Sequence, residues 1–178
     1  MKALSSSGYV LLGLLMERPC HGYELYQAFS DPASLGQVWH LGMSHMYAEL
    51  KKLEAAGMVK STIERRDLRP PRKIFALSSI GRFAFNKWMD TPARGVREMR
   101  LEFMVRLFFA RRAGRKTLSR LIVQQQNALN YELVALVPGK PEAGARNDYA
   151  ELVRKFRISQ LHAALDWLEA CRKLGGRG

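Results

Sequence analysis

One short stretch of this 178-residue chain gathers side chains that form hydrogen bonds and carry positive charge. Ser44, His45 and Tyr47 offer a hydroxyl, an imidazole and a phenol, and Lys51 and Lys52 add two ammonium groups. The first three groups can bond the polar edges of a partner, and ammonium groups attract phosphates. The stretch therefore predicts a polar binding surface, and the alternative is an ordinary solvated face of a helix.

A single amphipathic helix over residues 41–57 would present these groups together. Its apolar residues recur at spacings of three and four, which predicts one buried stripe: Met43, Met46, Leu50 and Leu53. The polar side chains fall largely off that stripe. Gly57 supplies the conformationally permissive residue at which such a helix can end.

A basic hairpin is predicted directly after this helix, from Met58 to Leu77. Val59, Ser61 and Ile63 alternate with polar neighbours, as in a half-buried strand, and residues 74–77 form the return strand. The tip between them, residues 65–73, holds five Arg or Lys against one Asp, and its two prolines stiffen it. A polar-faced helix followed by a basic hairpin is the arrangement with which a winged helix binds DNA.

Further helices are predicted before and after this unit. Residues 9–16 form a nearly continuous apolar run behind three serines that can cap it, so this helix must be buried on most sides, against its own domain or a second subunit. Residues 21–29 form a second short helix with Leu25 and Phe29 directed inward. A fourth helix from Ser78 offers four large side chains for burial: Phe83, Phe85, Trp88 and Met89.

The character of the chain changes after a turn-rich junction at residues 91–95. Long helices are predicted beyond it, over 98–112, from a cap at Thr117 to Leu136, and from about Ala145 to Leu174. The last helix carries apolar residues near a helical period, which favours packing of helix against helix: Tyr149, Leu152, Phe156, Ala163, Trp167, Cys171 and Leu174. The sequence therefore predicts a mostly α fold with domains at residues 1–90 and 97–178.

Positive charge is spread over both predicted domains. The formal net charge is +13 and the isoelectric point is near 10.2, which favours polyanionic partners. Residues 1–90 carry 12 Lys and Arg against 8 Asp and Glu, and residues 91–178 carry 17 against 8. The excess is therefore not confined to the predicted binding half, and local clusters must support any assignment.

Several classes of function find no support in the sequence. Cys20 and Cys171 are far apart and lack metal-spaced neighbours, which fits a reducing cytoplasm. We find no targeting or transmembrane segment, no phosphate-binding loop, no zinc motif and no nucleophile motif. We therefore expect a cytoplasmic protein that is no enzyme, needs no cofactor or metal, and does not engage a membrane.

Four blocks of the N-terminal half resemble the PadR-type transcriptional regulators, in family order and at family-like spacing over about residues 4–90. The blocks are residues 11–15, 19–25, 46–59 and 71–81, which read LLGLL, PCHGYEL, MYAELKKLEAAGMV and PRKIFALSSIG. A softer resemblance over residues 100–110 points to the branch with a longer helical C-terminal domain. One departure is the His45-Met46 pair, which stands where Thr-Leu is frequent, so no operator sequence can be carried over.

The resemblance implies a winged helix-turn-helix with a two-stranded β wing, followed by an α-helical dimerisation domain. It implies a homodimer, most often a repressor, bound to a pseudo-palindromic operator in double-stranded DNA, with release by a small aromatic molecule in some members. The C-terminal helices and the apolar first helix would form the dimer. Tyr47 would contact DNA, with core packing as its alternative.

The expected DNA-binding residues fall into three groups. The helix contributes Ser44, His45, Tyr47, Lys51 and Lys52, and the wing contributes Arg66, Arg69, Arg72 and Lys73. His21, Gly22 and Tyr23 open the second helix, where free backbone amides could hold a phosphate; the alternative is a simple turn with Tyr23 in the core. Two other functions remain open, a protein-binding winged helix with a helical arm and a protein that coats nucleic acid without sequence preference.

Overall fold

The computed structural model describes residues 4–31, 35–66, 69–136 and 148–175 of the chain. It divides into two compact units, Met1–Thr91 and Pro92–Gly178. The first contains α1 (Ser6–Glu17), β1 (Cys20–His21), α2 (Gly22–Ser30), a 3₁₀ turn η1 (Leu35–Gln37), α3 (Met43–Ala55), β2 (Val59–Arg66), β3 (Arg69–Leu77) and α4 (Ser79–Met89). The second contains α5 (Gly95–Glu98), a π-helical turn η2 (Met99–Phe103), α6 (Met104–Ala113), α7 (Arg115–Ala135) and α8 (Asp148–Gly175).

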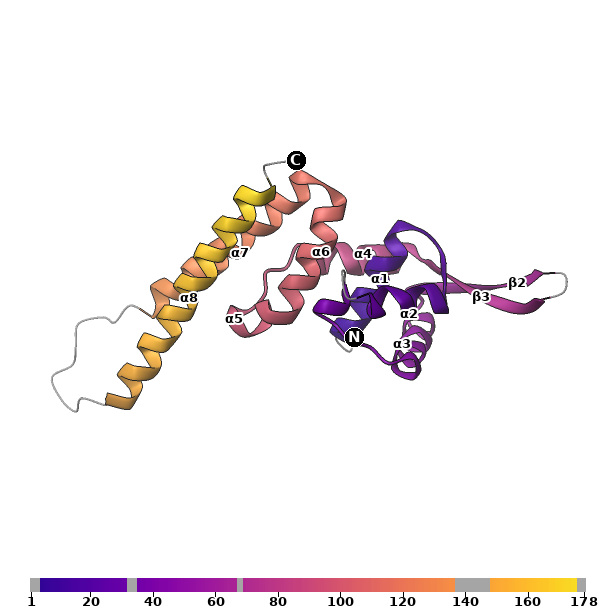
Figure 1. The fold of residues 1–178 in the computed structure, drawn as a ribbon, viewed down its shortest axis with the longest axis horizontal. Helices are drawn as coiled ribbons and strands as arrows, with labels where there is room; N and C mark the ends of the chain where they lie inside the picture. The colour runs from indigo at the N-terminus through magenta and orange to yellow at the C-terminus, as the bar shows by residue number, and fades with distance from the viewer. Residues whose placement is uncertain (1–3, 32–34, 67–68, 137–147, 176–178) are drawn as a thin grey trace. The chain divides into compact units, whose positions relative to one another are not determined.

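The N-terminal unit is a winged helix-turn-helix. Its helices pack around α1, and β2 and β3 form a long hairpin that extends away from them (Figure 1). The sheet has the order β1-β3-β2 and is antiparallel throughout, with Val59 opposite Leu77 and Glu64 opposite Arg72. The short strand β1 was not anticipated, because two residues are too few to show an alternating pattern.

The apolar residues of the first helix, α1, are buried in the core of its own unit. Val10, Leu11 and Leu12 are completely buried, and α1 packs on α3, α4 and β3. In the same helix, the Tyr9 ring stacks on Trp88 of α4 at a centroid distance of 4.9 Å. The expectation that this apolar run joins a dimer interface is therefore wrong for its buried residues, because their own domain already covers them.

Two terminal signals in the sequence correspond to helix ends in the structure. Ser5 caps α1 by accepting a hydrogen bond from the Gly8 amide at 3.1 Å. After α3, Gly57 has φ +69°, a conformation that suits glycine, and the Met58 amide reaches back to the Leu53 carbonyl at 2.9 Å. The helix α3 therefore ends close to the predicted residue.

Three other expectations for side chains and helix ends are wrong. Phe83 is 70% exposed on α4, because it lies on the opposite side from Phe85 and Trp88. Thr117 does not cap the helix that contains it, since α7 already begins at Arg115 after Gly114, whose φ is +103°. The wing tip is shorter than residues 65–73, because pairing continues to Arg66 opposite Arg69 and Pro71 lies in β3.

The C-terminal unit pairs α7 with α8 as antiparallel neighbours (Figure 1). The residues that α8 buries are Leu161 and Leu168, whereas most of the predicted stripe remains exposed: Tyr149, Leu152, Phe156 and Trp167. The predicted start at Ala145 and the side chain of Leu174 lie outside the described residues. The amide group of Gln125, fully buried on α7, bonds both the amide and the carbonyl of Ala93 at 2.8 and 3.0 Å. This pair of bonds holds the first residues of the unit on α7.

Candidate nucleic-acid interface

The helix α3 has one buried face and one exposed polar face. Met46, Leu50 and Leu53 are at most 2% exposed, as their spacing predicts. Met43 is 42% exposed, so the stripe begins one turn later than predicted, because Met43 is the first residue of the helix. The exposed face holds all five polar residues singled out in the sequence: Ser44, His45, Tyr47, Lys51 and Lys52.

Tyr47 joins this face to the start of α2. Its ring is 45% exposed, so core packing does not account for it. A Cβ atom placed on Gly22 would lie 2.3 Å from the Tyr47 hydroxyl, which no real contact tolerates. Gly22 therefore makes room for the Tyr47 side chain. The sequence alone predicts that glycine here lets a phosphate approach, whereas the structure shows the approach of a tyrosine.

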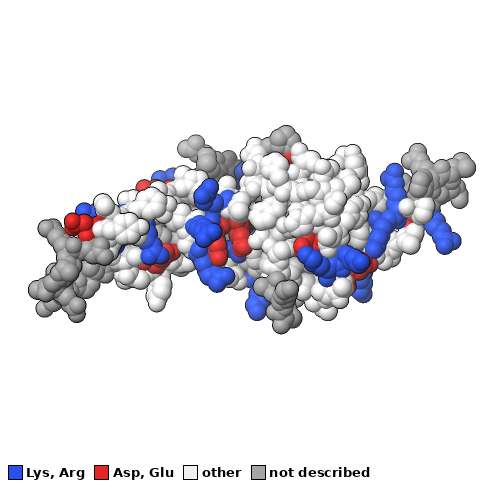
Figure 2. Space-filling view, turned by 90° about the horizontal axis from the view of Figure 1, so that it is seen from below, with Lys and Arg blue, Asp and Glu red and all other residues white. Residues whose placement is uncertain are grey.

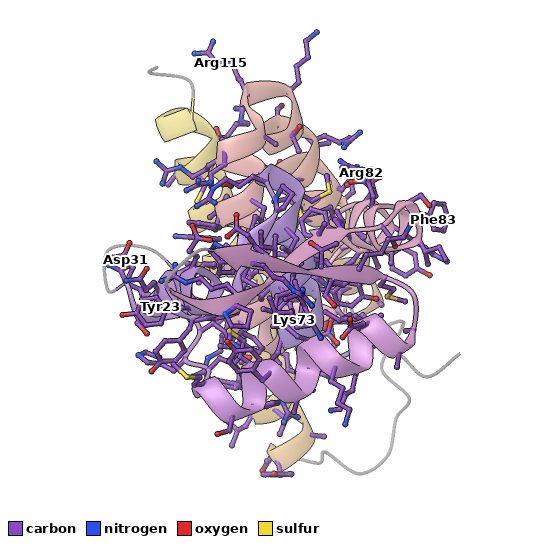
Figure 3. The ribbon with its side chains drawn as sticks, turned by 90° about the vertical axis from the view of Figure 1, so that its right-hand side faces the viewer. Tyr23, Asp31, Lys73, Arg82, Phe83 and Arg115 are labelled. Carbon is purple, nitrogen blue, oxygen red and sulfur yellow. The ribbon has the colours of Figure 1, made fainter. Side chains whose placement is uncertain are left out.

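The two neighbours of Gly22 lie in different surroundings. The Tyr23 side chain is 60% exposed and points away from the core, so the alternative of a core tyrosine is wrong (Figure 3). The His21 side chain is only 20% exposed, and its Nε2 lies 3.9 Å from Glu64 of the wing. The His21 amide bonds the Glu24 carboxylate at 2.8 Å, which helps to hold the pKa of Glu24 below its usual value.

A buried carboxylate holds a lysine on the α3 face. Glu49 is 5% exposed and accepts hydrogen bonds from the Ser5 hydroxyl at 2.8 Å and the Lys52 ammonium at 2.7 Å, with His45 Nε2 at 3.6 Å. Burial raises the pKa of Glu49, but these bonds outweigh it and hold the pKa below its usual value. Lys52 is therefore held along the helix by an ion pair, and α3 is tied to the cap of α1.

A second carboxylate ties α3 to both strands of the wing. Glu54 accepts hydrogen bonds from Ser61 of β2 and from Lys73 of β3, the latter at 2.9 Å. These two bonds lower the pKa of Glu54. The Lys73 ammonium also lies 5.3 Å from the centroid of the Phe75 ring, and its side chain lies between the wing and α3 (Figure 3). Lys73 is thus a link between helix and wing as well as a surface cation.

The wing carries exposed positive charge toward its end. Arg65 and Arg72 are exposed, and the space-filling view shows Lys and Arg gathered over this hairpin (Figure 2). Arg66 and Arg69 pair through their backbones at the end of the ladder, and their side chains lie outside the described residues. Arg72 is therefore the predicted wing arginine whose exposure the structure describes.

Sequence reasoning missed Glu49 and Glu54, the two acidic residues whose bonds hold the parts of this surface together. Glu49 stands three residues before Lys52, a spacing that signals a possible helical ion pair. Glu54 has no comparable signal, since Ser61 and Lys73 are brought to it only by the packing of the wing. Among the described residues, no group of three His, Cys, Asp or Glu side chains is placed to hold a metal ion.

The fold and this surface define a winged helix-turn-helix domain with a polar α3 face beside a basic wing. Residues 11–87 match the transcriptional regulator PadR-like family. This match places the winged-helix half of the chain among transcriptional regulators, which agrees with the prediction that the chain is not an enzyme. No helix in the described part of the chain is long and apolar enough to cross a membrane.

Several known proteins are similar to this chain. The negative transcriptional regulator PadR of Bacillus subtilis is 29% identical over 119 residues, which are 66% of this chain and 63% of that protein. The chain thus matches less than two thirds of this relative's length. The crystal structure of Bacillus subtilis PadR with operator DNA has 24% identity, covers 93% of this chain and 97% of its own, and has a TM-score of 0.48. The structure of the same protein with p-coumaric acid has 22% identity, covers 100% and 99%, and has a TM-score of 0.44.

Proposed function

We propose that this protein is a homodimeric, sequence-specific DNA-binding regulator that represses transcription from a pseudo-palindromic operator in the cytoplasm. The observation that carries the proposal is the exposed polar face of α3, which lies beside a basic wing that Glu54 fastens to the same helix. The major groove of DNA is wide enough for such a helix. The two elements would therefore reach the duplex as one rigid surface.

The side chains divide by the chemistry they offer to DNA. Ser44, His45 and Tyr47 lie in the first two turns of α3, where they would bond base edges and flanking phosphates. Cations further along the helix and on the wing would bind the phosphate backbone, which positions the protein without specifying sequence: Lys51, Lys52, Arg66, Arg69, Arg72 and Lys73. Tyr23 and the α2 start would add a phosphate contact, with His21 and Gly22 holding its geometry.

The exposed apolar face of α8 supports a homodimer. Tyr149, Leu152 and Phe156 follow one another on one side of the helix and are each more than 60% exposed. Contiguous apolar surface of this kind marks protein interfaces. A second copy that covers it would bring two α3 helices to half-sites about one or more DNA turns apart.

We also propose that a small aromatic molecule binds this protein and controls its release from DNA. A groove of about 560 Å³ lies between the π-helical turn and α8, with Met99, Met104 and Trp167 among its walls and Arg100 at its side. Flat apolar molecules fit such walls, and a guanidinium can pair with a carboxylate. The structure of the Bacillus subtilis relative with p-coumaric acid makes that compound the first molecule to try. Because Trp167 also lies on the exposed side of α8, an effector there would alter the proposed dimer.

Fluorescence anisotropy with duplex from the protein's own upstream region, against random duplex, tests DNA recognition. A regulator should prefer one upstream segment by roughly 10³-fold or more. Equal affinity for both would support a coating protein, and no discrete complex with either would support a protein-binding module.

Isothermal titration of p-coumaric acid into the protein with and without that duplex tests the effector. A switch requires tighter binding to the DNA-free dimer. Equal affinities would remove this part of the proposal and leave the DNA-binding part intact.

A further inference from the structure

A cluster of basic side chains lies where α6 meets α7 in the C-terminal unit, and none of them is among the residues assigned to DNA so far. Six Arg or Lys stand between Glu102 and Glu132, and no Asp or Glu does. Five of the six are exposed, and we call them the basic turn: Arg111, Arg112, Arg115, Lys116 and Arg120. The C-terminal half carries most of the chain's excess positive charge, and the DNA-binding role proposed for the winged helix does not explain it.

The geometry of the turn directs these cations outward. Gly114, with φ +103°, reverses the chain so that Arg111 and Arg112 end α6 while Arg115 and Lys116 begin α7. Arg112 lies over the Phe108 ring at 5.3 Å, which supports the stem of its side chain. Arg115 points away from the helices of its unit (Figure 3).

The end of α8 beside this turn supplies little negative charge. Burial raises the pKa of the Cys171 thiol on α8, and the nearby Arg111 guanidinium opposes this effect. Glu169 of α8 also interacts with Gln126 of α7, so the end of α8 is a neighbour of the basic turn. Glu169 is occupied by Arg172, at 2.7 and 2.9 Å, and by Lys173 at 3.9 Å. This acid therefore pairs within α8 and brings two further cations toward the basic turn.

Two of these cations, Arg115 and Lys116, stand where positive charge opposes a helix dipole. The first turn of α7 holds Arg115 and Lys116, has no acidic residue and has no side-chain cap. Positive charges at a helix N-terminus oppose its dipole. A sequence that breaks a local rule in this way does so most often for a binding function.

We propose that the basic turn is a second, sequence-independent contact for the phosphate backbone of duplex DNA, separate from the winged helix. This proposal rests on the proposed function. A phosphate backbone fits the surface because the described residues 102–122 expose no large apolar side chain, and the two that flank this range, Leu101 and Val123, are each less than half exposed. Membrane-bound helices and protein hot spots both need such anchors, whereas phosphate contacts need only Lys and Arg.

The test compares random-sequence duplex and upstream duplex at salt concentrations from about 50 to about 200 mM. A basic-turn variant carries Arg111→Gln, Arg112→Gln, Arg115→Gln, Lys116→Gln and Arg120→Gln. Its matched control removes five exposed cations that lie outside the turn and outside the surfaces assigned to DNA or to the effector: Lys87→Gln, Arg94→Gln, Arg97→Gln, Lys155→Gln and Arg157→Gln. Circular dichroism and sedimentation verify that both variants fold and keep the wild-type assembly state.

The basic-turn variant should lose about 10-fold or more in affinity for both duplexes at low salt, with a flatter salt slope and an unchanged preference for upstream DNA. Its melting temperature should be unchanged or higher, because the N-terminal charges of α7 are gone. An unchanged salt slope, or an equal loss in the control variant, would overturn the proposal. So would lost binding to vesicles containing phosphatidylserine with duplex binding retained, which assigns the turn to membranes.

Failure of the proposed function looks different in the same assay. The wild-type protein would then show no preference between the two duplexes, while the basic-turn variant would still lose affinity for random duplex. A variant with Tyr47→Ala separates the two surfaces further, since it should reduce the preference and leave the salt slope near that of the wild type.

Discussion

The helices α3 and α8 both carry an apolar stripe, but they use it in opposite ways. The stripe of α3 is buried in its own unit, and its polar side is exposed. In α8, Leu161 and Leu168 face α7, while a second apolar side with Tyr149 and Phe156 is exposed. An exposed polar face suits a nucleic-acid partner and an exposed apolar face suits a protein partner. Substitutions on the two helices should therefore separate DNA recognition from assembly.

The largest expected effect comes from Phe156→Arg on α8. A charge in the proposed dimer interface should give a monomer in sedimentation velocity, and operator affinity should fall by about 100-fold or more, since two linked half-sites bind far more tightly than one. The control is Phe83→Arg, the same substitution at an equally exposed phenylalanine on α4. A persistent dimer in Phe156→Arg would exclude the exposed apolar side of α8 from the dimer interface.

The next largest effect is expected from Tyr47→Ala on α3. Loss of the phenol should cost about 1–3 kcal/mol of discrimination between upstream and random duplex, with the dimer intact. Tyr131→Ala, which removes a strongly exposed tyrosine from α7, serves as control. An unchanged footprint for Tyr47→Ala would remove this residue from the interface.

A smaller effect is expected from Gly22→Ala, which places a methyl group where the Tyr47 phenol lies. The displaced ring should weaken upstream binding by less than Tyr47→Ala does. The double variant should bind as the Tyr47→Ala variant does, because the clash then has no partner. Additive losses would instead indicate that Gly22 contributes to DNA binding independently, as the expected approach of a phosphate requires.

Glu54→Ala tests whether the tie between α3 and the wing contributes to DNA affinity. Without the carboxylate, Ser61 and Lys73 lose their tie to α3, so affinity should fall several-fold for upstream and random duplex alike. Glu54→Gln keeps an acceptor for Ser61 and should fall in between. A gain in affinity for Glu54→Ala would show that the ion pair withholds Lys73 from phosphate.

The smallest expected effect concerns acid stability. The pKa values of Glu49 and Glu54 are lowered in the folded state, so their stabilisation is present above the ordinary value of 4.5 and is lost as the pH falls through the folded values. Thermal melts should show the wild type losing stability below about pH 4.5, and the Glu49→Gln, Glu54→Gln variant losing less. Equal pH dependence in both proteins would contradict this role.

Local sequence determined much of this protein. Periodic apolar residues placed α3 and its buried Met46, Leu50 and Leu53, and Gly57 marked its end, because helix period and glycine conformation act over a few residues. The family blocks identified the winged helix from residues that are near in sequence. The assignments of individual DNA contacts and of the dimer stay predictions.

Tertiary structure decided which of several possible faces became the core. The α8 sequence offers two apolar sides, and only the fit of Leu161 and Leu168 against α7 selects one for burial. Likewise, the tie from Glu54 to Lys73 joins residues 19 positions apart, and the phenol beside Gly22 comes from another helix. Burial and close contact depend on neighbours distant in the chain, and a local pattern cannot contain that information.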